Sequence, residues 1–215
     1  MTYTTILNRL QSANEGGAAF NGAKVLETIE FIRELIRKET AAETGESKRY
    51  NAAKKILSDK RMKNRPILQK AVIRDGLQTF TNSYVLFMLS DHIPGLLMHD
   101  AENDARYPVV SRLVELGRAS VCSVSFNAGE LKSIIASQGN ADIMELFTIG
   151  GLACYVDPEM IAAAITIMNY RNDDEITIRY NAPVSGGQIM SPLVMERGES
   201  LGLVLPMHKP EKDSE

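Results

Sequence analysis

The residues best suited to chemistry form one basic block between positions 48 and 65. Its cations are Lys48, Arg49, Lys54, Lys55, Lys60, Arg61, Lys63 and Arg65, and its single acid is Asp59. Eight cations and one anion give this block a charge of +7, so a chain with a net charge of -3 carries -10 elsewhere. Screening by salt confines charge effects to about 8 Å, so a local basic block can hold phosphates on an acidic protein. The block predicts a phosphate-binding surface, and the alternative is a solvated helix face that keeps the protein soluble.

Residues typical of metal sites or nucleophilic catalysis are sparse. The closest grouping of possible ligands is Asp91-His92 with His99-Asp100, and its spacing matches no zinc pattern. Cys122 and Cys154 lie in apolar surroundings without basic neighbours, which favours small core residues over nucleophiles. The Gly pairs at positions 16, 150 and 186 lack the context of a phosphate loop. We predict no catalytic residue, no metal and no cofactor, and keep a hydrolase that uses the His and Asp residues of 91–100 as an alternative.

The basic block lies on a predicted helix that is followed by strands. At 100° per residue, Tyr50, Ala53, Ile56 and Leu57 share one face of the segment 48–59, and the basic residues gather on the other. Arg65-Pro66 ends this helical region. Alternating segments at 66–74, 77–81 and 84–89 are separated by the turn pairs Asp75-Gly76 and Asn82-Ser83, which is typical of an antiparallel meander.

Helix and strand patterns recur along the rest of the chain. They predict an amphipathic helix at 24–38, a polar connection at 40–47, a strand at 120–126, a helix after the N-cap Asn127, a strand-like run at 143–149, a helix at 158–168 after the N-cap Asp157, a strand at 175–180, and a hairpin of 192–197 with 200–207. Three units of a helix followed by strands indicate an α+β fold with an internal repeat of architecture.

Composition and termini narrow the class of protein. With 44% hydrophobic and 24% charged residues, the 215-residue chain has the composition of a globular protein. The apolar stretch Leu146–Tyr155 is too short to cross a bilayer, and the first residues lack the pattern of a signal peptide. We therefore expect a cytoplasmic, reduced protein without a membrane-spanning segment.

Two stretches resemble the bacterial DNA sliding clamp, the beta subunit of DNA polymerase III. In the first, residues 68–86 end in Thr81-Asn82-Ser83-Tyr84-Val85-Leu86, which is similar to the turn motif Thr-Asp-Gly-aromatic/His-Arg-Leu of that family. In the second, residues 155–208 end in Leu203-Val204-Leu205-Pro206-Met207-His208, where the family ends Met-Pro-Met-Arg. With Tyr107-Pro108, which resembles the family's lead-in to its last domain, the resemblance covers about residues 47–209.

This chain also departs from the family pattern. Asn82, Ser83 and Val85 replace the family's Asp, Gly and Arg, and His208 replaces its terminal Arg. The family has three similar domains, whereas this chain has room for half of one and a shortened last one. The reduced size suggests a phage or mobile-element version. We expect an N-terminal extension at 1–46 with the added helix, a partial clamp-like unit at 47–106, a C-terminal clamp-like domain at 107–209 and a tail at 210–215.

The resemblance implies a DNA-clamp-like fold, in which helices face DNA and sheets lie outside, and it implies two sites. The phosphate contacts, made without reading sequence, would be Lys48, Lys54, Lys55, Arg61 and Lys63. A pocket for a partner's clamp-binding peptide would be formed by Thr81, Ser83, Tyr84, Leu86, Leu203, Val204, Pro206 and Met207. Ordinary core and turn packing is the alternative for the pocket residues. We further expect Tyr84, Leu86, Val204 and Met207 to line one shallow apolar groove.

Two functions are consistent with these motifs and this charge pattern. The first is a non-catalytic, sliding-clamp-like factor that associates with double-stranded DNA, supports replication or polymerase processivity, binds replication proteins, and assembles as a homo-oligomer. The second is a protein-interaction adaptor that keeps the peptide pocket without encircling DNA.

Overall fold

The computed structural model describes residues 22–99, 107–139, 141–183 and 187–209. The expected tail at 210–215, most of the expected N-terminal extension before the added helix, and Asp100 of the His/Asp grouping lie outside these described residues. Over the described ranges, no helix combines the length and apolar character needed to cross a membrane.

The described part of the chain starts with two helices that meet at a tight turn. They are α2 (Gly22–Glu43) and α3 (Ser47–Leu57), and the 3-10 turns η1 (Lys60–Met62) and η2 (Pro66–Gln69) follow. The predicted helix at 24–38 is confirmed, but it continues into the stretch expected to be a polar connection. Gly45, at a φ of +75°, provides the left-handed conformation that ends it.

The predicted meander is confirmed in three short strands, β1 (Val72–Arg74), β2 (Leu77–Thr81) and β3 (Val85–Leu89). Asp75 and Gly76 connect the first two with φ values of 51° and 76°. Positive φ at both central residues is what a two-residue hairpin turn requires, and an Asp-Gly pair adopts it readily.

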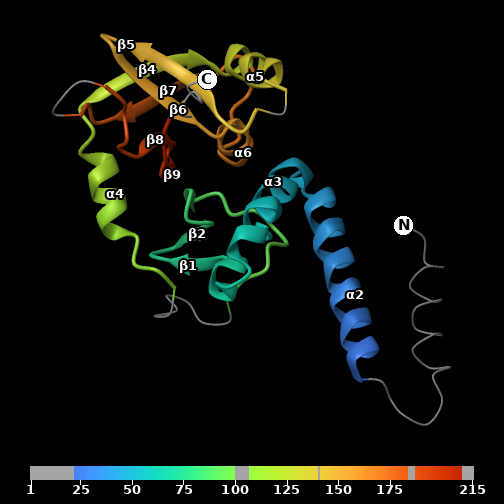
Figure 1. The fold of residues 1–215 in the computed structure, drawn as a ribbon. Helices are drawn as coiled ribbons and strands as arrows, with labels where there is room; N and C mark the ends of the chain where they lie inside the picture. Colours follow the sequence, from blue (N-terminus) through green and yellow to red (C-terminus); the bar gives the residue numbers. More distant parts are fainter. Residues whose placement is uncertain (1–21, 100–106, 140, 184–186, 210–215) are drawn as a thin grey trace, which may run out of the picture.

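The second half alternates helices and strands. Its elements are α4 (Ser111–Arg118), β4 (Cys122–Asn127), α5 (Ala128–Ser137), β5 (Met144–Ile149), β6 (Leu152–Val156), α6 (Pro158–Ile167), β7 (Glu175–Tyr180), β8 (Leu193–Arg197) and β9 (Ser200–Val204) (Figure 1). The predicted N-caps are confirmed, because the Asn127 side chain accepts from the N–H groups of Gly129 and Glu130, and that of Asp157 accepts from Glu159. The sequence did not predict α4 or β6.

Seven strands form one antiparallel sheet in the order β1-β2-β3-β9-β8-β7-β4, and β5 pairs with β6 separately. The central pair joins β3 to β9, with Val85 opposite Val204 and Leu86 opposite Leu203. Strands from both halves of the chain therefore share one sheet. The α+β class and the order of helix and strands are as expected, while the division between residues 106 and 107 stays a prediction.

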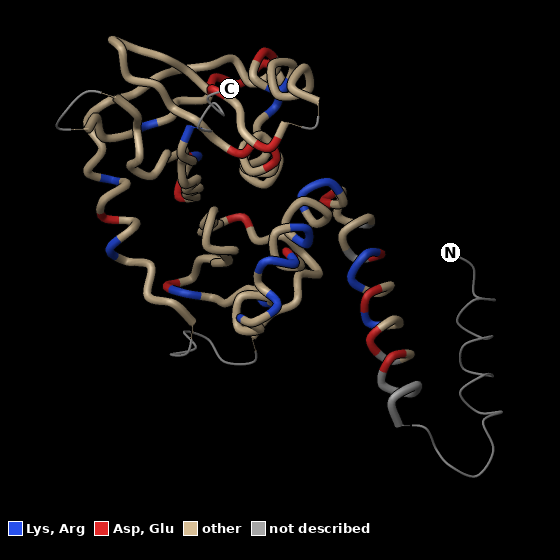
Figure 2. Tube along the Cα trace, viewed as in Figure 1, with Lys and Arg blue, Asp and Glu red and all other residues tan. Residues whose placement is uncertain are grey.

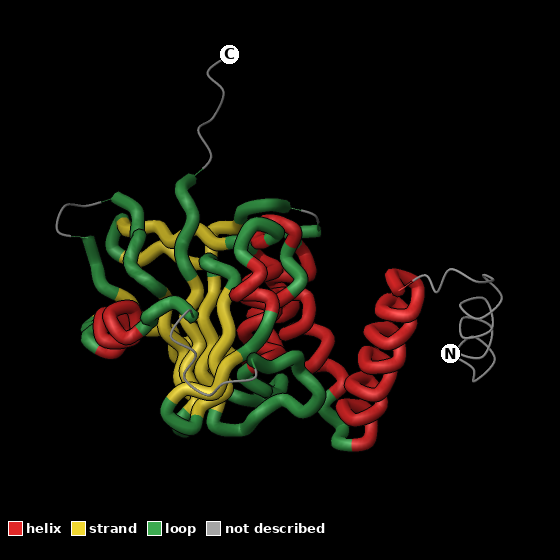
Figure 3. Tube along the Cα trace, turned by 90° about the horizontal axis from the view of Figure 1, so that it is seen from below, coloured by secondary structure: helices red, strands yellow, loops and turns green. Residues whose placement is uncertain are grey.

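Helices cover both faces of the sheet (Figure 3). On one face, α3 and α6 pack together over the main core, which includes Phe80, Phe87 and Ile165. On the other face, α4 covers a smaller cluster that includes Leu86, Val194 and Leu203. Gly117 permits this close approach, since a Cβ atom there would lie 2.9 Å from Cγ2 of Val194 and 3.0 Å from Cδ2 of Leu203.

We predict that Gly117→Ala destabilises the protein by about 1 kcal/mol, because overpacking at the sheet outweighs the better helix propensity of Ala. Urea unfolding followed by circular dichroism measures the change. The control is Leu116→Ala, since that neighbouring side chain is 47% exposed and its truncation should change the free energy of unfolding by less than about 0.5 kcal/mol. Equal stability of Gly117→Ala and the parent would contradict the close contact.

Candidate functional site

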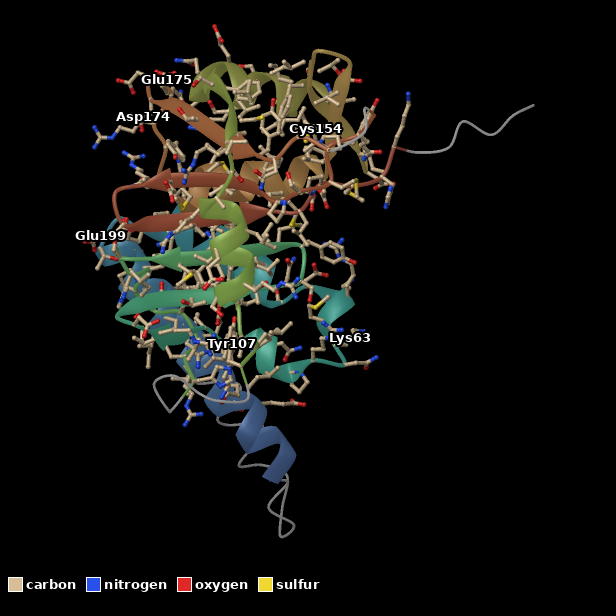
Figure 4. The ribbon with its side chains drawn as sticks, turned by 90° about the vertical axis from the view of Figure 1, so that its left-hand side faces the viewer. Lys63, Tyr107, Cys154, Asp174, Glu175 and Glu199 are labelled. Carbon is tan, nitrogen blue, oxygen red and sulfur yellow. The ribbon has the colours of Figure 1, made fainter. Side chains whose placement is uncertain are left out.

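The basic stripe lies on the outer face of α3 and continues into η1. Tyr50, Ala53, Ile56 and Leu57 are buried, as the helical wheel predicts. Lys48 and Lys55 are exposed on the opposite face, and Lys60 and Lys63 follow in the next turn. Figure 2 shows the concentration of cationic residues along this part of the chain, and Figure 4 places Lys63 at the margin of the molecule.

Three of the five predicted phosphate contacts are engaged within the chain. Lys54 pairs with Glu34 of α2, Lys55 Nζ lies 2.9 Å from Glu159 of α6, and Arg61 pairs with Asp59. Lys48 and Lys63 have no ion-pair partner among the described residues. Exposed ion pairs contribute only about 0 to 1 kcal/mol, so a phosphate could displace Glu159 from Lys55 at low cost.

Arg49 belongs to the basic block in sequence but not to the basic surface. Its side chain is buried, donates from Nε to the carbonyl oxygen of Ile167 at 2.8 Å, and pairs with Glu46 and Asp91 at 2.9 and 3.0 Å. It thereby satisfies a carbonyl in the last turn of α6, where a cation is favourable. Since Arg49 begins α3 and Lys55 near its end meets the first turn of α6, the two helices run antiparallel. On the helical wheel, Arg49 lies on the apolar face of the segment 48–59, and this position could have predicted that it is buried.

Arg61 links the two predicted sites. Its guanidinium donates from Nε to both carboxylate oxygens of Asp59 at 3.0 Å and lies 4.3 Å from the ring centroid of Tyr84. The same carboxylate accepts from Nδ2 of Asn82 at 2.9 Å. A predicted phosphate contact and a predicted pocket residue therefore touch each other, and Asp59 ties both to the turn between β2 and β3.

Asn82 organises that turn. Its Oδ1 accepts from the backbone N–H groups of Tyr84 and Val85, both at 3.1 Å, and Ser83 adopts a φ of 73°. Nearby, the Thr81 hydroxyl donates to the carbonyl oxygen of Val85. An Asn side chain that accepts from following backbone groups closes this type of turn locally. Ser83 and Tyr84 remain exposed at its tip.

The pairing of β3 with β9 brings the two halves of the predicted peptide pocket together, although they do not form one groove. Leu86 and Leu203 face α4, whereas Val204 is fully buried in the main core on the opposite side of the sheet. Pro206 is buried, and Met207 is half-buried. The expectation that Val204 lines a groove with Tyr84, Leu86 and Met207 is therefore wrong, since adjacent residues of a strand point to opposite faces.

The sequence analysis did not predict an apolar cavity beside α4. A cavity of about 460 Å³ lies beside this helix, with Leu77, Met88, Val110 and Val114 among its lining residues and Arg74 and Arg118 at its polar part. On other positions of α4, Leu113 and Leu116 are 39% and 47% exposed. In the sequence, the helical spacing of Val110, Val114 and Gly117 was the only pattern that indicated α4, and it spans just two turns.

The remaining chemical candidates have structural partners. The Nε2 atoms of His92 and His99 lie 2.9 and 2.8 Å from the carbonyl oxygens of Gly76 and Ile67. Cys154 is fully buried, and burial raises the pKa of its thiol to about 12. A thiol with such a pKa is a poor nucleophile at neutral pH.

We predict that Asp59→Asn lowers the free energy of unfolding by about 1 kcal/mol at neutral pH. Hydrogen bonds from Arg61 hold the pKa of the Asp59 carboxyl below its usual value of 3.8, against the opposing effect of burial. A lowered pKa in the folded state stabilises above the unfolded value and is lost as pH falls through the folded value. The difference between parent and variant should therefore shrink as pH falls below 3.8.

Denaturant unfolding over a pH series checks this prediction. The exposed Asp142 provides the control, because Asp142→Asn should leave the curve unchanged. A stability difference that is the same at pH 7 and at acid pH would show that the Asp59 charge is not responsible.

Comparison with known proteins gives matches among solved structures alone. No protein-family model and no curated protein matches the chain. The DNA polymerase III beta subunit of Thermotoga maritima is 10% identical with a TM-score of 0.48, over 77% of this chain and 63% of its own. That of Borrelia burgdorferi, in complex with a natural product, is 11% identical with a TM-score of 0.48, over 76% and 63%. The Helicobacter pylori beta clamp bound to a DNA ligase peptide is 11% identical with a TM-score of 0.39, over 62% and 41%. The chain thus spans 41 to 63% of the length of these clamp chains, and all three structures are DNA polymerase III beta subunits or beta clamps.

Proposed function

We propose that this protein is a non-catalytic, sliding-clamp-like factor that associates with double-stranded DNA and supports replication or polymerase processivity. The observation that carries the proposal is the exposed basic face of α3 and η1. Lys48, Lys55, Lys60 and Lys63 face solvent there, while the opposite side of α3 packs into the core beside α6.

Such a surface suits phosphates better than bases. Its unpaired exposed cations are Lys side chains, which bind phosphates as point charges and lack the planar fork that reads base edges. Contacts between Lys side chains and phosphates give an affinity for DNA that depends on salt concentration but not on the base sequence. The ion pairs Lys54–Glu34 and Lys55–Glu159 weaken the attraction of this face to phosphates, but its net charge stays positive.

Surrounding a duplex would require several copies of this chain, since only α3 and η1 contribute a basic face among the described elements. The proposal therefore includes a homo-oligomer. A mass measurement in solution tests the homo-oligomer alone, and a strict monomer at micromolar concentration would favour a protein-interaction adaptor that does not encircle DNA.

We predict that the double variant Lys48→Ala and Lys55→Ala weakens binding to duplex DNA of any sequence. Each lost phosphate contact removes about 0.9 from the slope of log affinity against log salt, so the slope should fall by about 1.8. Fluorescence anisotropy across a salt series measures it. The control is Arg112→Ala with Arg118→Ala, which removes two cations from α4 on the other face of the sheet. An unchanged slope in the Lys variant would remove the DNA role from α3.

A protein-interaction adaptor is the second candidate, and exposed apolar side chains favour it. Tyr84 is 37% exposed at the turn tip, and Leu113 and Leu116 are exposed on α4. Apolar and aromatic side chains held on rigid elements are typical anchors for a short peptide. Met207 follows β9 in the chain and is half-buried, with its backbone N–H donating to the carbonyl oxygen of Tyr155 at 2.8 Å.

We predict that Met207→Ala weakens binding of a clamp-binding peptide by about 1 to 2 kcal/mol if Met207 contacts the peptide. The DNA ligase peptide of the Helicobacter pylori complex is a suitable probe. Met190→Ala is the control, because Met190 is 42% exposed and outside the predicted pocket. A titration followed by backbone NMR reports the site directly. If residues 81–86 and 203–208 show no shift at saturation, the pocket is absent.

A further inference from the structure

A second cavity is lined by residues of α2, of the end of α3 and of the Leu96-Leu97 loop. It has a volume of about 370 Å³, within the range of small-molecule sites. Leu57, Leu96 and Leu97 supply apolar surface, and Lys60 and Lys63 of the η1 region line its polar side with the Gln69 amide. The cavity therefore combines an apolar part with cations and an amide donor.

The position of α2 against the loop beside it closes one side of this cavity. Gly95 lies so near α2 that a Cβ atom there would be 2.6 Å from the carbonyl oxygen of Arg37, and its φ of +80° suits glycine. On the other side, Tyr50 is buried and its hydroxyl donates to Glu34 at 3.1 Å. These contacts hold α2, α3 and the Leu96-Leu97 loop in a fixed arrangement around the space.

The charges around the cavity are not balanced. Its lining includes four cations, Arg37, Lys54, Lys60 and Lys63, and two anions, Glu34 and Asp59. Both anions are already compensated, Glu34 by Lys54 and Arg37, and Asp59 by Arg61 and Asn82. The Asp59 side chain is only 10% exposed. Lys60 and Lys63 are exposed and have no ion-pair partner among the described residues, so the cavity presents two uncompensated positive charges.

We propose that this cavity binds a nucleoside monophosphate group, with its phosphate at Lys60 and Lys63 and its base over Leu57, Leu96 and Leu97. A phosphate carries about two negative charges near neutral pH and accepts several hydrogen bonds, which matches two free ammonium groups and the Gln69 amide. Leu57 and Leu96 are largely covered by the protein, whereas Leu97 is 36% exposed. A free phosphate would leave Leu97 uncovered, and an uncharged nucleoside would leave the lysines unpaired. The group could come from a free nucleotide or from the 5′-phosphorylated end of a DNA strand.

The site shares Lys60 and Lys63 with the proposed duplex surface, but it extends from them toward α2 and the Leu96-Leu97 loop rather than along the outer face of α3. Lys48, on that outer face, is not among the residues that line the cavity. Mononucleotide binding is measured without duplex DNA, and the Lys48/Lys55 variant, whose two positions do not line the cavity, tests the duplex proposal alone. The two proposals can therefore fail independently.

Isothermal titration of the full chain with dAMP, deoxyadenosine and inorganic phosphate provides the test. We expect dAMP to bind more tightly than either fragment, and Lys60→Ala with Lys63→Ala to weaken dAMP binding by about tenfold or more, since hydrogen bonds to charged groups are among the stronger ones. Lys48→Ala is the matched control and should leave dAMP binding unchanged. In NMR spectra, the methyl groups of Leu96 and Leu97 should shift on titration with dAMP.

Short oligonucleotides with and without a 5′-phosphate distinguish the two sources. Binding of the phosphorylated oligonucleotide that is tighter than binding of both dAMP and the unphosphorylated oligonucleotide identifies a DNA end, and equal or tighter binding of dAMP identifies a free nucleotide. Equal affinity for dAMP and deoxyadenosine, no dAMP binding at millimolar concentration, or unchanged affinity in the Lys60/Lys63 variant would each overturn the proposal. Both lysines are exposed, so loss of folding does not complicate the result, and thermal unfolding of the variant verifies this.

Discussion

The pairing of β3 with β9 is the constraint on which the rest of the structure depends. It joins strands that are more than 100 residues apart in sequence and makes one sheet from both halves of the chain. Because side chains alternate along a strand, this register directs Val85 and Val204 toward α3 and α6, and Leu86 and Leu203 toward α4. A slip by one residue would exchange these faces and remove both cores at once.

The sequence predicted those elements whose signals are local. Asn127 and Asp157 marked two helix starts, and Asp75-Gly76 marked a hairpin turn, because capping and positive φ depend on the residues themselves. The helix α4 was missed for the opposite reason. It is short, it exposes Leu113 and Leu116 while burying Val114, and Gly117 has meaning only once Val194 and Leu203 are placed beneath it.

The candidate sites, like the secondary structure, could be predicted only where the signal is local. Helical periodicity correctly separated the exposed Lys48 and Lys55 from the buried face of α3, but periodicity carries no information on partners from distant elements. Glu34 of α2 and Glu159 of α6 neutralise Lys54 and Lys55 of the basic stripe. Arg49 does not belong to the stripe, because its side chain donates to the carbonyl oxygen of Ile167 at the end of α6. The predicted groove failed at Val204 because its residues were assigned by motif and not by strand face.

The sheet also ends differently at its two edges. At one edge, β1 is partly shielded, since Ala71 bridges to Met98 and accepts from the N–H group of His99. At the other, β4 contains neither a charged residue nor a proline, the usual means of protecting an edge, and no further described strand pairs with it. Among the described strands, β4 is therefore the sheet edge with less protection against pairing with a strand of another molecule.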